Sequence, residues 1–485
     1  ETAAALGHAV HEGEWLKACA AQHLIVPAGL LGRLLDAGLA ATGRVGWGFA
    51  HGFLRDALVD DARAAGRWVE INRACAGAVT ARVGNGSCPV ERAATHLIEA
   101  GELAAAVDTL LLVIGARMAE NNYRRALSLA ALRSDLLDRI GAPAEDVRRY
   151  RQLPMEVDAL RFLGRFAESD ALLAHLSAYP GVPGRTRLLA DAARLRGARN
   201  LMLGDPGRTW REYEDAAALY VQLGDKQGEA KARHGMAWAL VYLSRFERAH
   251  GEFLRSHAAA VAGEHDMDAG WALHGAAATL VFRRQEGAIP LLGQAVEHFE
   301  RAASRSGLAS ALLFLGEAHR QRGERALAWD FTRRADALYK IAESNLRGIA
   351  IVQAICLHLD NDDEVAARAQ LEEIDDATFD RLQRQFQPVV WITRAYFAAK
   401  AGAFDEMSAA FTQIEAAPLG GLVHPGLRER MDHLGAYLEA TRREADAARL
   451  WRLGMQVWRF EPSISAEYEA RLAVRMGASG VAHRA

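Results

Sequence analysis

Residues 232–242 read ARHGMAWALVY, and residues 245–254 read RFERAHGEFL. Apolar residues recur in each stretch with helical spacing, and Ser244 lies between the two, which predicts two helices joined by a turn. The small residue Ala237 would let the first helix lie close to the second near Ala249. Phe253 is then expected to fill the space toward the next unit. One such hairpin cannot bury its apolar face alone, so stacking must provide the core.

The pattern of this hairpin recurs at a nearly constant spacing along the chain. The small residue of the second helix appears at Ser169, Thr209, Ala249, Ala288, Ala328, Ala367, Met407 and Ala447. The separations are 40, 40, 39, 40, 39, 40 and 40 residues. A fixed period of this length predicts stacked helical units and not a closed catalytic domain. We expect an all-α, right-handed α-solenoid of helical hairpins with almost no strand outside residues 40–50.

The N-terminal part does not follow the period. Residues 30–39 have the pattern of a helix, the glycine-punctuated residues 42–49 predict a short hairpin, and residues 51–65 resume helical periodicity. Helix, hairpin and helix in this order are typical of a small winged-helix domain. We therefore divide the chain into a winged-helix-like segment with a linker helix at 1–85, irregular capping repeats at 86–149, regular repeats at 150–462, and a C-terminal cap and tail at 463–485.

The composition restricts the classes of partner. The 485 residues include 58 basic and 61 acidic side chains, a net charge of −3 that argues against a general nucleic-acid binder. Residues 30–39, which would be the recognition segment of a winged helix, carry a single basic residue, Arg33. The four scattered cysteines predict reduced thiols in a cytoplasmic protein. No uncharged stretch reaches membrane-spanning length, so we expect no membrane partner.

Catalytic and metal-binding motifs are missing from the sequence. It contains no Gly-x-x-x-x-Gly-Lys-Ser/Thr, no His-Glu-x-x-His and no Gly-x-Ser-x-Gly. We therefore expect no catalytic residue, no metal site and no cofactor bound by this chain. The acidic residues 360–364 lack the glycine of a calcium loop, and residues 362–364 are instead expected to cap the following helix.

The order of small residue, tyrosine or leucine, turn glycine, alanine and aromatic residue over about residues 150–460 resembles the tetratricopeptide repeat. The 39–40 residue period is similar to the longer repeats of bacterial regulators of the signal-transduction ATPase (STAND) class. Residues 34–39 and 47–58 resemble the end of the winged-helix domain of those ATPases. The resemblance implies a non-catalytic sensor that binds a protein or peptide, coupled to an ATPase or effector in cis or trans. ATP or ADP would bind in that missing ATPase domain.

The resemblance also implies functional residues. A histidine at the place of His51 contacts the β-phosphate of ADP in related ATPases, and the alternative for His51 is a packed residue of a small domain. The positions that line the concave groove of tetratricopeptide units correspond here to Arg194, Lys231, His234, Trp238, Tyr242, Glu317, Arg320, Gln321, Tyr396 and Lys400.

In this groove, Trp238, Tyr242 and Tyr396 would anchor a polypeptide, and Lys231, Arg320 and Lys400 would pair with its acidic groups. Alternatively, the apolar members of the set simply pack against neighbouring helices. A second function class is also open, an independent tetratricopeptide scaffold or adaptor that assembles a protein complex.

Overall fold

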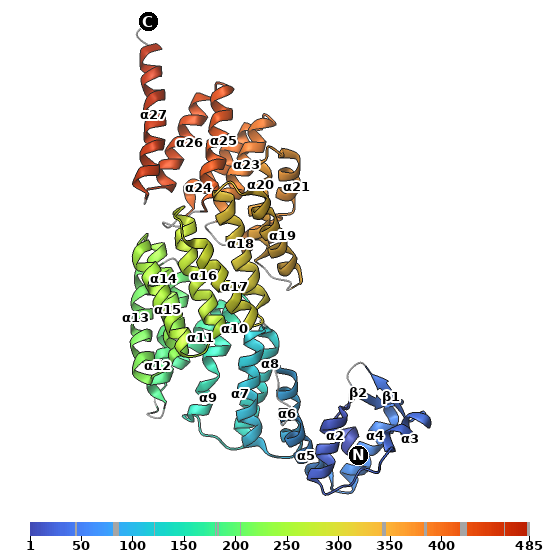
Figure 1. The fold of residues 1–485 in the computed structure, drawn as a ribbon. Coiled ribbons are helices and arrows are strands. Elements are labelled where there is room, and N and C mark those ends of the chain that lie inside the picture. Colours follow the sequence, from blue (N-terminus) through green and yellow to red (C-terminus); the bar gives the residue numbers. More distant parts are fainter. Residues whose placement is uncertain are drawn as a thin grey trace. The chain divides into compact units, whose positions relative to one another are not determined.

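The computed structural model is built mostly of paired helices (Figure 1). It describes residues 1–43, 46–80, 87–120, 122–179, 181, 184–203, 205–341, 346–382, 386–417, 424–459 and 461–482. The chain forms two compact units, Glu1–Leu195 and Arg196–Ala485, and each is described by itself. The all-α class and the stacked hairpins predicted from the period are confirmed.

The first unit begins with short helices and a β-hairpin and continues with helical hairpins. Its elements are α1 (Thr2–Ala5), α2 (Glu12–Ala21), α3 (Leu30–Asp36), β1 (Ala40–Gly43), β2 (Gly46–Phe49), α4 (Gly52–Ala64), α5 (Trp68–Thr80), α6 (Ser87–Glu99), α7 (Leu103–Ala119), α8 (Tyr123–Arg139), α9 (Val147–Arg151), α10 (Leu153–Phe162) and α11 (Phe166–Ser177). Helix α12 (Arg185–Met202) contains the boundary between the two units.

The expected order of helix, hairpin and helix is present as α3, β1–β2 and α4. The strands pair antiparallel, with Thr42 opposite Trp47, and Val10 forms a further bridge to Trp47. The rings of Trp47 and Trp15 lie 5.2 Å apart in the buried core of this region. In the described residues, strands occur only within residues 40–49, as predicted. A winged-helix domain at this place stays a prediction.

The second unit is a series of helical hairpins. Its helices are α13 (Pro206–Leu223), α14 (Lys226–Tyr242), α15 (Phe246–Ala262), α16 (Asp266–Phe282), α17 (Ala288–Arg301), α18 (Arg305–Gln321), α19 (Arg325–Ile341), α20 (Arg347–Asp360), α21 (Glu364–Glu372), α22 (Asp376–Arg381), α23 (Gln387–Lys400), α24 (Phe404–Ala416), α25 (Gly426–Ala440), α26 (Glu444–Val457) and α27 (Pro462–Ala482). Helices that are adjacent in the sequence contact each other, as in α14–α15 and α16–α17.

Small residues of the repeat leave room for aromatic rings of the neighbouring unit. A Cβ atom added at Gly275 on α16 would lie 2.3 Å from the ring of Phe253 on α15, and one at Gly235 on α14 would lie 2.2 Å from the ring of Tyr213 on α13. Both separations are far below the van der Waals contact of about 3.5–4 Å. The predicted role of Phe253, filling the space toward the next unit, is therefore confirmed.

The acidic stretch after α20 caps a helix, as predicted. Asp363 is the N-cap residue of α21, and its side chain accepts a hydrogen bond from the backbone N–H of Ala366 at 3.0 Å. The carboxylate satisfies a backbone donor that the first turn of a helix leaves without an intrahelical partner.

Leucine in place of Ala249 should destabilise the second unit by about 1–3 kcal/mol, because overpacking a close helix contact forces side chains out of their rotamers. Ala249 is fully buried in one cluster with Ala237 and Ala276. Urea unfolding followed by circular dichroism measures the change. Ala258 is exposed on the same helix, so Ala258→Leu is the matched control and should leave the midpoint unchanged. An unchanged midpoint for Ala249→Leu would contradict the register of the repeats.

Candidate functional site on the inner face

First helices of neighbouring hairpins in the second unit contact one another. Helix α14 contacts α16, α16 contacts α18, α18 contacts α20, and α23 contacts α25. We call the surface formed by these first helices the inner face. Helix α25 also contacts α20 on this face. Nine of the ten predicted groove residues lie on α14, α18 and α23, which makes the inner face the candidate site.

Aromatic and histidine side chains follow one another along part of this face. We call His234 and Trp238 on α14, Trp271 and His274 on α16, and Phe314 on α18 the aromatic strip. The indole N–H of Trp238 donates to His234 Nε2 at 3.0 Å. The ring of His274 lies 5.4 Å from that of Trp271 and 4.6 Å from that of Phe314. His234, His274 and Phe314 are separated by 40 residues each, so the period itself places them in line.

Both histidines of the aromatic strip are neutral at pH 7. Burial lowers the pKa of His234 to about 4. Burial, together with the nearby His234, lowers the pKa of His274 to about 3. The His274 side chain is buried, and neither of its ring nitrogens has a hydrogen-bond partner among the residues that the structure describes. An uncompensated polar group of this kind costs stability.

The anchors predicted on α14 are only partly accessible. Trp238 and Tyr242 are half-buried against the cluster that contains Ala237 and Phe253. The rings of Trp238 and Phe253 meet edge to face at 5.4 Å. Lys231, one turn before His234, is exposed. Trp238 and Tyr242 therefore fit both interpretations in part: each packs against neighbouring helices, and each keeps a partly exposed surface that a ligand could contact.

Six charged side chains meet further along the inner face and form an ionic cluster: Arg284, Glu317, Arg320, Asp360, Glu429 and Arg430. Arg320 donates to both carboxylate oxygens of Glu317, at 2.8 and 2.9 Å, and to Asp360 at 2.6 Å. Asp360 also pairs with Arg430, and Glu429 pairs with Arg284. Three basic and three acidic groups balance, which compensates the charges of the buried members Glu317, Arg320 and Arg430.

The pairing decides the charge state of Glu317. Burial alone would raise the pKa of this carboxyl group, but the Arg320 guanidinium, His424 and the hydrogen bonds from Arg320 and Gln321 lower it to about 2. The Glu317 side chain is only 4% exposed and is therefore an ionised buried carboxylate at every pH above that value.

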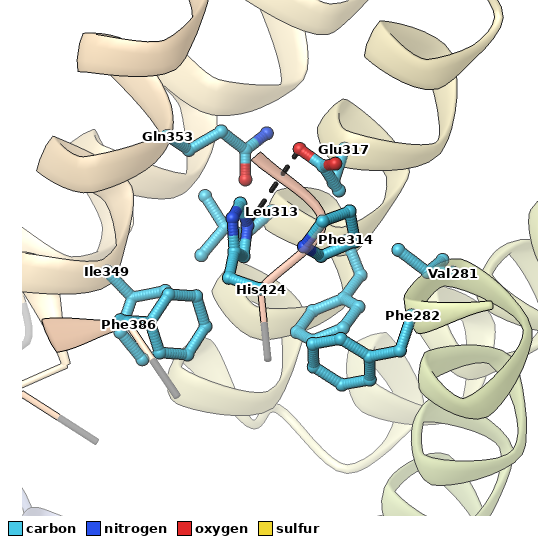
Figure 2. Close-up of a pocket in the computed structure, with 10 residues that line it drawn as sticks. Val281, Phe282, Leu313, Phe314, Glu317, Ile349, Gln353, Phe386 and His424 are labelled. Carbon is cyan, nitrogen blue, oxygen red and sulfur yellow. Dashed lines mark ion pairs between the residues drawn. The ribbon is translucent and has the colours of Figure 1, made fainter. Parts of the chain in front are cut away.

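A cavity of about 10 Å³ lies beside the ionic cluster, which is room for one water molecule. Figure 2 shows Glu317 and His424 facing each other at its edge, with Phe282, Phe314 and Phe386 below them. The backbone N–H of Gly426 donates to His424 Nδ1 at 3.1 Å, so the proton of the neutral ring is on Nε2. That nitrogen lies 3.9 Å from Glu317 Oε2. Burial, aided by nearby arginines, lowers the pKa of His424 to about 4.

The structure differs from the open groove that the register predicts at Glu317, Arg320 and Gln321. Glu317 and Arg320 are buried, and Gln321 donates to Val281 O and to Glu317. Arg320, expected to meet acidic groups of a ligand, is instead surrounded by acidic groups of this chain. The physical reason is that α25 covers this part of the inner face and supplies Glu429.

The predicted groove residues of α23 also hold a partner within the chain. The Tyr396 hydroxyl donates to Glu364 at 2.6 Å, and Lys400 Nζ donates to both oxygens of the same carboxylate at 2.7 and 2.6 Å. Arg194 belongs to the first unit, where it pairs with Asp158 at 2.9 Å. The predicted groove set is therefore divided between the aromatic strip, the ionic cluster and these separate pairs.

His51 lies at the start of α4 as its N-cap residue, and its side chain makes no capping hydrogen bond. It is exposed, and its ring stacks on that of Phe53 at 5.4 Å. Phe53 is itself 73% exposed. The alternative of His51 as a packed core residue is therefore wrong, while a contact to ADP stays a prediction.

Sequence reasoning missed the part played by residues 424–430. All of them are buried or half-buried, and they supply His424, Glu429 and Arg430 to the inner face. The charged partners of these three residues are between 70 and 145 positions away in the sequence, as Asp360 and Arg284 show. A contact that skips several units leaves no trace in a 40-residue period.

The remaining chemistry of the described residues is limited. They contain no group of three or more histidine, cysteine, aspartate or glutamate side chains arranged to hold a metal ion. Burial raises the pKa of the Cys356 thiol to about 11, so this thiol is protonated at neutral pH. In the same ranges, no helix has both the length and the apolar character needed to cross a bilayer.

No protein-family model and no curated protein matches this chain. Its fold is similar to that of a Rap protein complexed with competence and sporulation factor, with a TM-score of 0.53, 13% identity, and coverage of 77% of this chain and 98% of that chain. It is also similar to a signal-transduction ATPase with numerous domains, from Pyrococcus horikoshii, which has a tetratricopeptide repeat sensor. That match has a TM-score of 0.56, 12% identity, and covers 85% of this chain and 62% of that chain.

The chain folds as a tetratricopeptide-like helical solenoid. At these identities the similarity establishes the fold of the solenoid alone. The solenoid also spans less than two thirds of the Pyrococcus ATPase, so the activity of that whole protein does not transfer with the fold.

Proposed function

We propose that this solenoid is a non-catalytic sensor module that binds a protein or peptide on its inner face. The observation that carries the proposal is the aromatic strip, where the half-buried Trp238 and Trp271 lie on neighbouring first helices near the exposed Lys231. Tryptophan offers a large contact area at a small cost in side-chain entropy. Stacked repeats present an extended surface, which suits a polypeptide better than a small metabolite.

In this proposal the solenoid passes the binding event to an ATPase or other effector outside the chain, in the bacterial cytoplasm. The similarity to an ATPase with a tetratricopeptide repeat sensor supports the coupling. The exposed pair His51 and Phe53 gives the first unit a surface for such a domain. ATP or ADP would bind in that domain, with His51 as a contact to ADP.

The second candidate is an independent scaffold or adaptor. The match to 98% of the Rap structure favours it, because nearly the whole of that chain corresponds to this solenoid. The reading frame upstream of Glu1 distinguishes the two candidates, since only the sensor of an ATPase should follow a phosphate-binding loop.

Alanine in place of Trp238 should weaken partner binding by about 2 kcal/mol, or roughly thirtyfold, because a central aromatic anchor is lost. The full chain serves as bait in an extract, the captured partner is identified by mass spectrometry, and its affinity for parent and variant is then measured by calorimetry. Cross-links from the partner should lie on α14 and α16.

Leu254→Ala is the matched control, because Leu254 is exposed on α15, a second helix of a hairpin. This variant should retain the partner at full affinity and melt near the parent. Undiminished affinity of Trp238→Ala, or cross-links confined to the second helices, would refute binding on the inner face.

A further inference from the structure

The start of α25 makes contacts that a simple array of repeats does not make. Each unit of such an array contacts only its neighbours. Helix α25 follows α23 in the series, yet residues 424–430 contact Arg284 after α16, Glu317 and Arg320 on α18, and Asp360 on α20. We call residues 424–430 the inner segment.

Two adjacent residues of the inner segment carry opposite charges into the ionic cluster. Glu429 pairs with Arg284 and lies 3.8 Å from Arg320. Arg430 pairs with Asp360, and its Nη1 donates to the backbone carbonyl of Cys356 at 3.4 Å. The inner face thus provides a basic site for a carboxylate next to an acidic site for a guanidinium.

The rest of the inner segment fits the same surface by shape. His424 lies against the ring of Phe386 at 5.1 Å and points its Nε2 toward Glu317 (Figure 2). Leu427 is fully buried in the apolar core that runs through the hairpins of the second unit. A histidine, a leucine and an acidic–basic pair therefore make up the recognition pattern of this surface.

The charged part of this fit is incomplete. Oε2 of Glu429 and Nε of Arg430 are both buried, and neither has a hydrogen-bond partner within the described part of the chain. Arg284 and Arg320 also share Glu429 as an acidic partner, and burial, together with the nearby Arg320, lowers the pKa of Arg284. These unsatisfied atoms reduce the net stability that the ion pairs of the inner segment provide.

We infer that the inner face between α16 and α20 is a docking site for a polypeptide segment with an acidic residue followed directly by a basic one, occupied here by the inner segment as a ligand in cis. The inference rests on the proposed function, since it names the chemistry of a partner for the inner face. An incoming segment must displace the inner segment, which is tethered and hence present at a high effective concentration.

The test uses the full chain and, as probe, a fluorescein-labelled peptide of residues 424–436. Glu429→Gln together with Arg430→Gln removes both charges of the inner segment at nearly constant size. Fluorescence anisotropy should show the peptide binding to this double variant at least about tenfold more tightly than to the parent, and binding should weaken at high salt. A control peptide with the order of Glu429 and Arg430 exchanged should bind about tenfold less tightly.

Hydrogen exchange on the parent provides a second measurement that needs no variant. Raising the salt concentration should speed exchange of the amides of residues 427–433 relative to those of α17, because screening weakens the ion pairs that hold the inner segment. Salt-independent exchange at 427–433 and the absence of peptide binding to the double variant would overturn the inference, and the inner segment would be a fixed part of the core.

Failure of this test is distinguishable from failure of the proposed function. Weakened partner binding by Trp238→Ala without peptide binding would reject the docking site at α16–α20 and leave the aromatic strip as the ligand surface. Peptide binding with an unaffected Trp238→Ala variant would support the docking site and reject the aromatic strip.

Discussion

The second unit should unfold at a lower urea concentration at pH 5 than at pH 7, because three of its histidines, the buried His274 and His424 and the half-buried His234, are neutral in the folded state. Burial lowers the pKa of His234 to about 4, of His274 to about 3 and of His424 to about 4, against 6.5 in the absence of burial. The contribution of these neutral histidines to the free energy of unfolding is fully present above about pH 6.5 and is lost as the pH falls toward 4, because only the unfolded chain takes up protons in that interval. Each histidine should contribute about 2 kcal/mol of the loss between pH 7 and pH 5.

The His274→Phe variant measures how much of the stability lost between pH 7 and pH 5 is due to His274. Phenylalanine already stands at the equivalent position of the next unit, Phe314, so the ring should fit. The variant should be at least as stable as the parent at pH 7, because two unpartnered ring nitrogens are removed. Its stability should also fall less steeply with acid. The same dependence on pH in variant and parent would show that His274 is not the buried neutral group described above.

Leucine in place of Glu317 alone should destabilise the second unit by about 3–5 kcal/mol, because Arg320 would lose its bidentate partner while it stays buried. Both side chains are only 4% exposed, so water cannot replace the lost carboxylate. Urea unfolding at pH 7, read by circular dichroism and tryptophan fluorescence, measures the change.

Glu317→Leu combined with Arg320→Leu is the matched comparison. The next unit already has apolar residues at the two equivalent positions, Cys356 and Leu359, and the remaining charges still pair, Asp360 with Arg430 and Glu429 with Arg284. The double variant should therefore recover much of the stability lost in the single variant. A double variant as unstable as Glu317→Leu would mean that packing, and not the uncompensated charge, dominates the single change.

The sequence was sufficient to predict the local and nearest-neighbour parts of the fold. The 40-residue period predicts the hairpins, and the alternation of small and large residues predicts the contact of Phe253 with the next unit. Asp363 was predictable as a helix cap, because a side-chain acceptor at that position has a local partner. These features depend on residues within about one unit of each other.

Long-range contacts account for what the sequence did not reveal. Glu317 and Arg320 have the spacing of residues that line a groove, and charged side chains are normally exposed. Their burial requires Asp360, which comes from the next unit, and also Glu429, which comes from a later unit and follows no period. The exposure of His51 was also not predictable, because it depends on where the rest of the first unit leaves the start of α4 uncovered.

The reach of α25 across the inner face has a mechanical consequence. An ordinary solenoid frays from its ends, because each terminal hairpin is held by one neighbour only. Here, Glu429 and Arg430 form ion pairs that connect the α25 hairpin to residues as early in the sequence as Arg284. The units between Arg284 and α25 are therefore also held by a contact between non-neighbouring units. When the array is unfolded from the C-terminus, by a pulling force or by an unfolding protease, unfolding should pause at α25. The units held together by this helix should then unfold in one cooperative step.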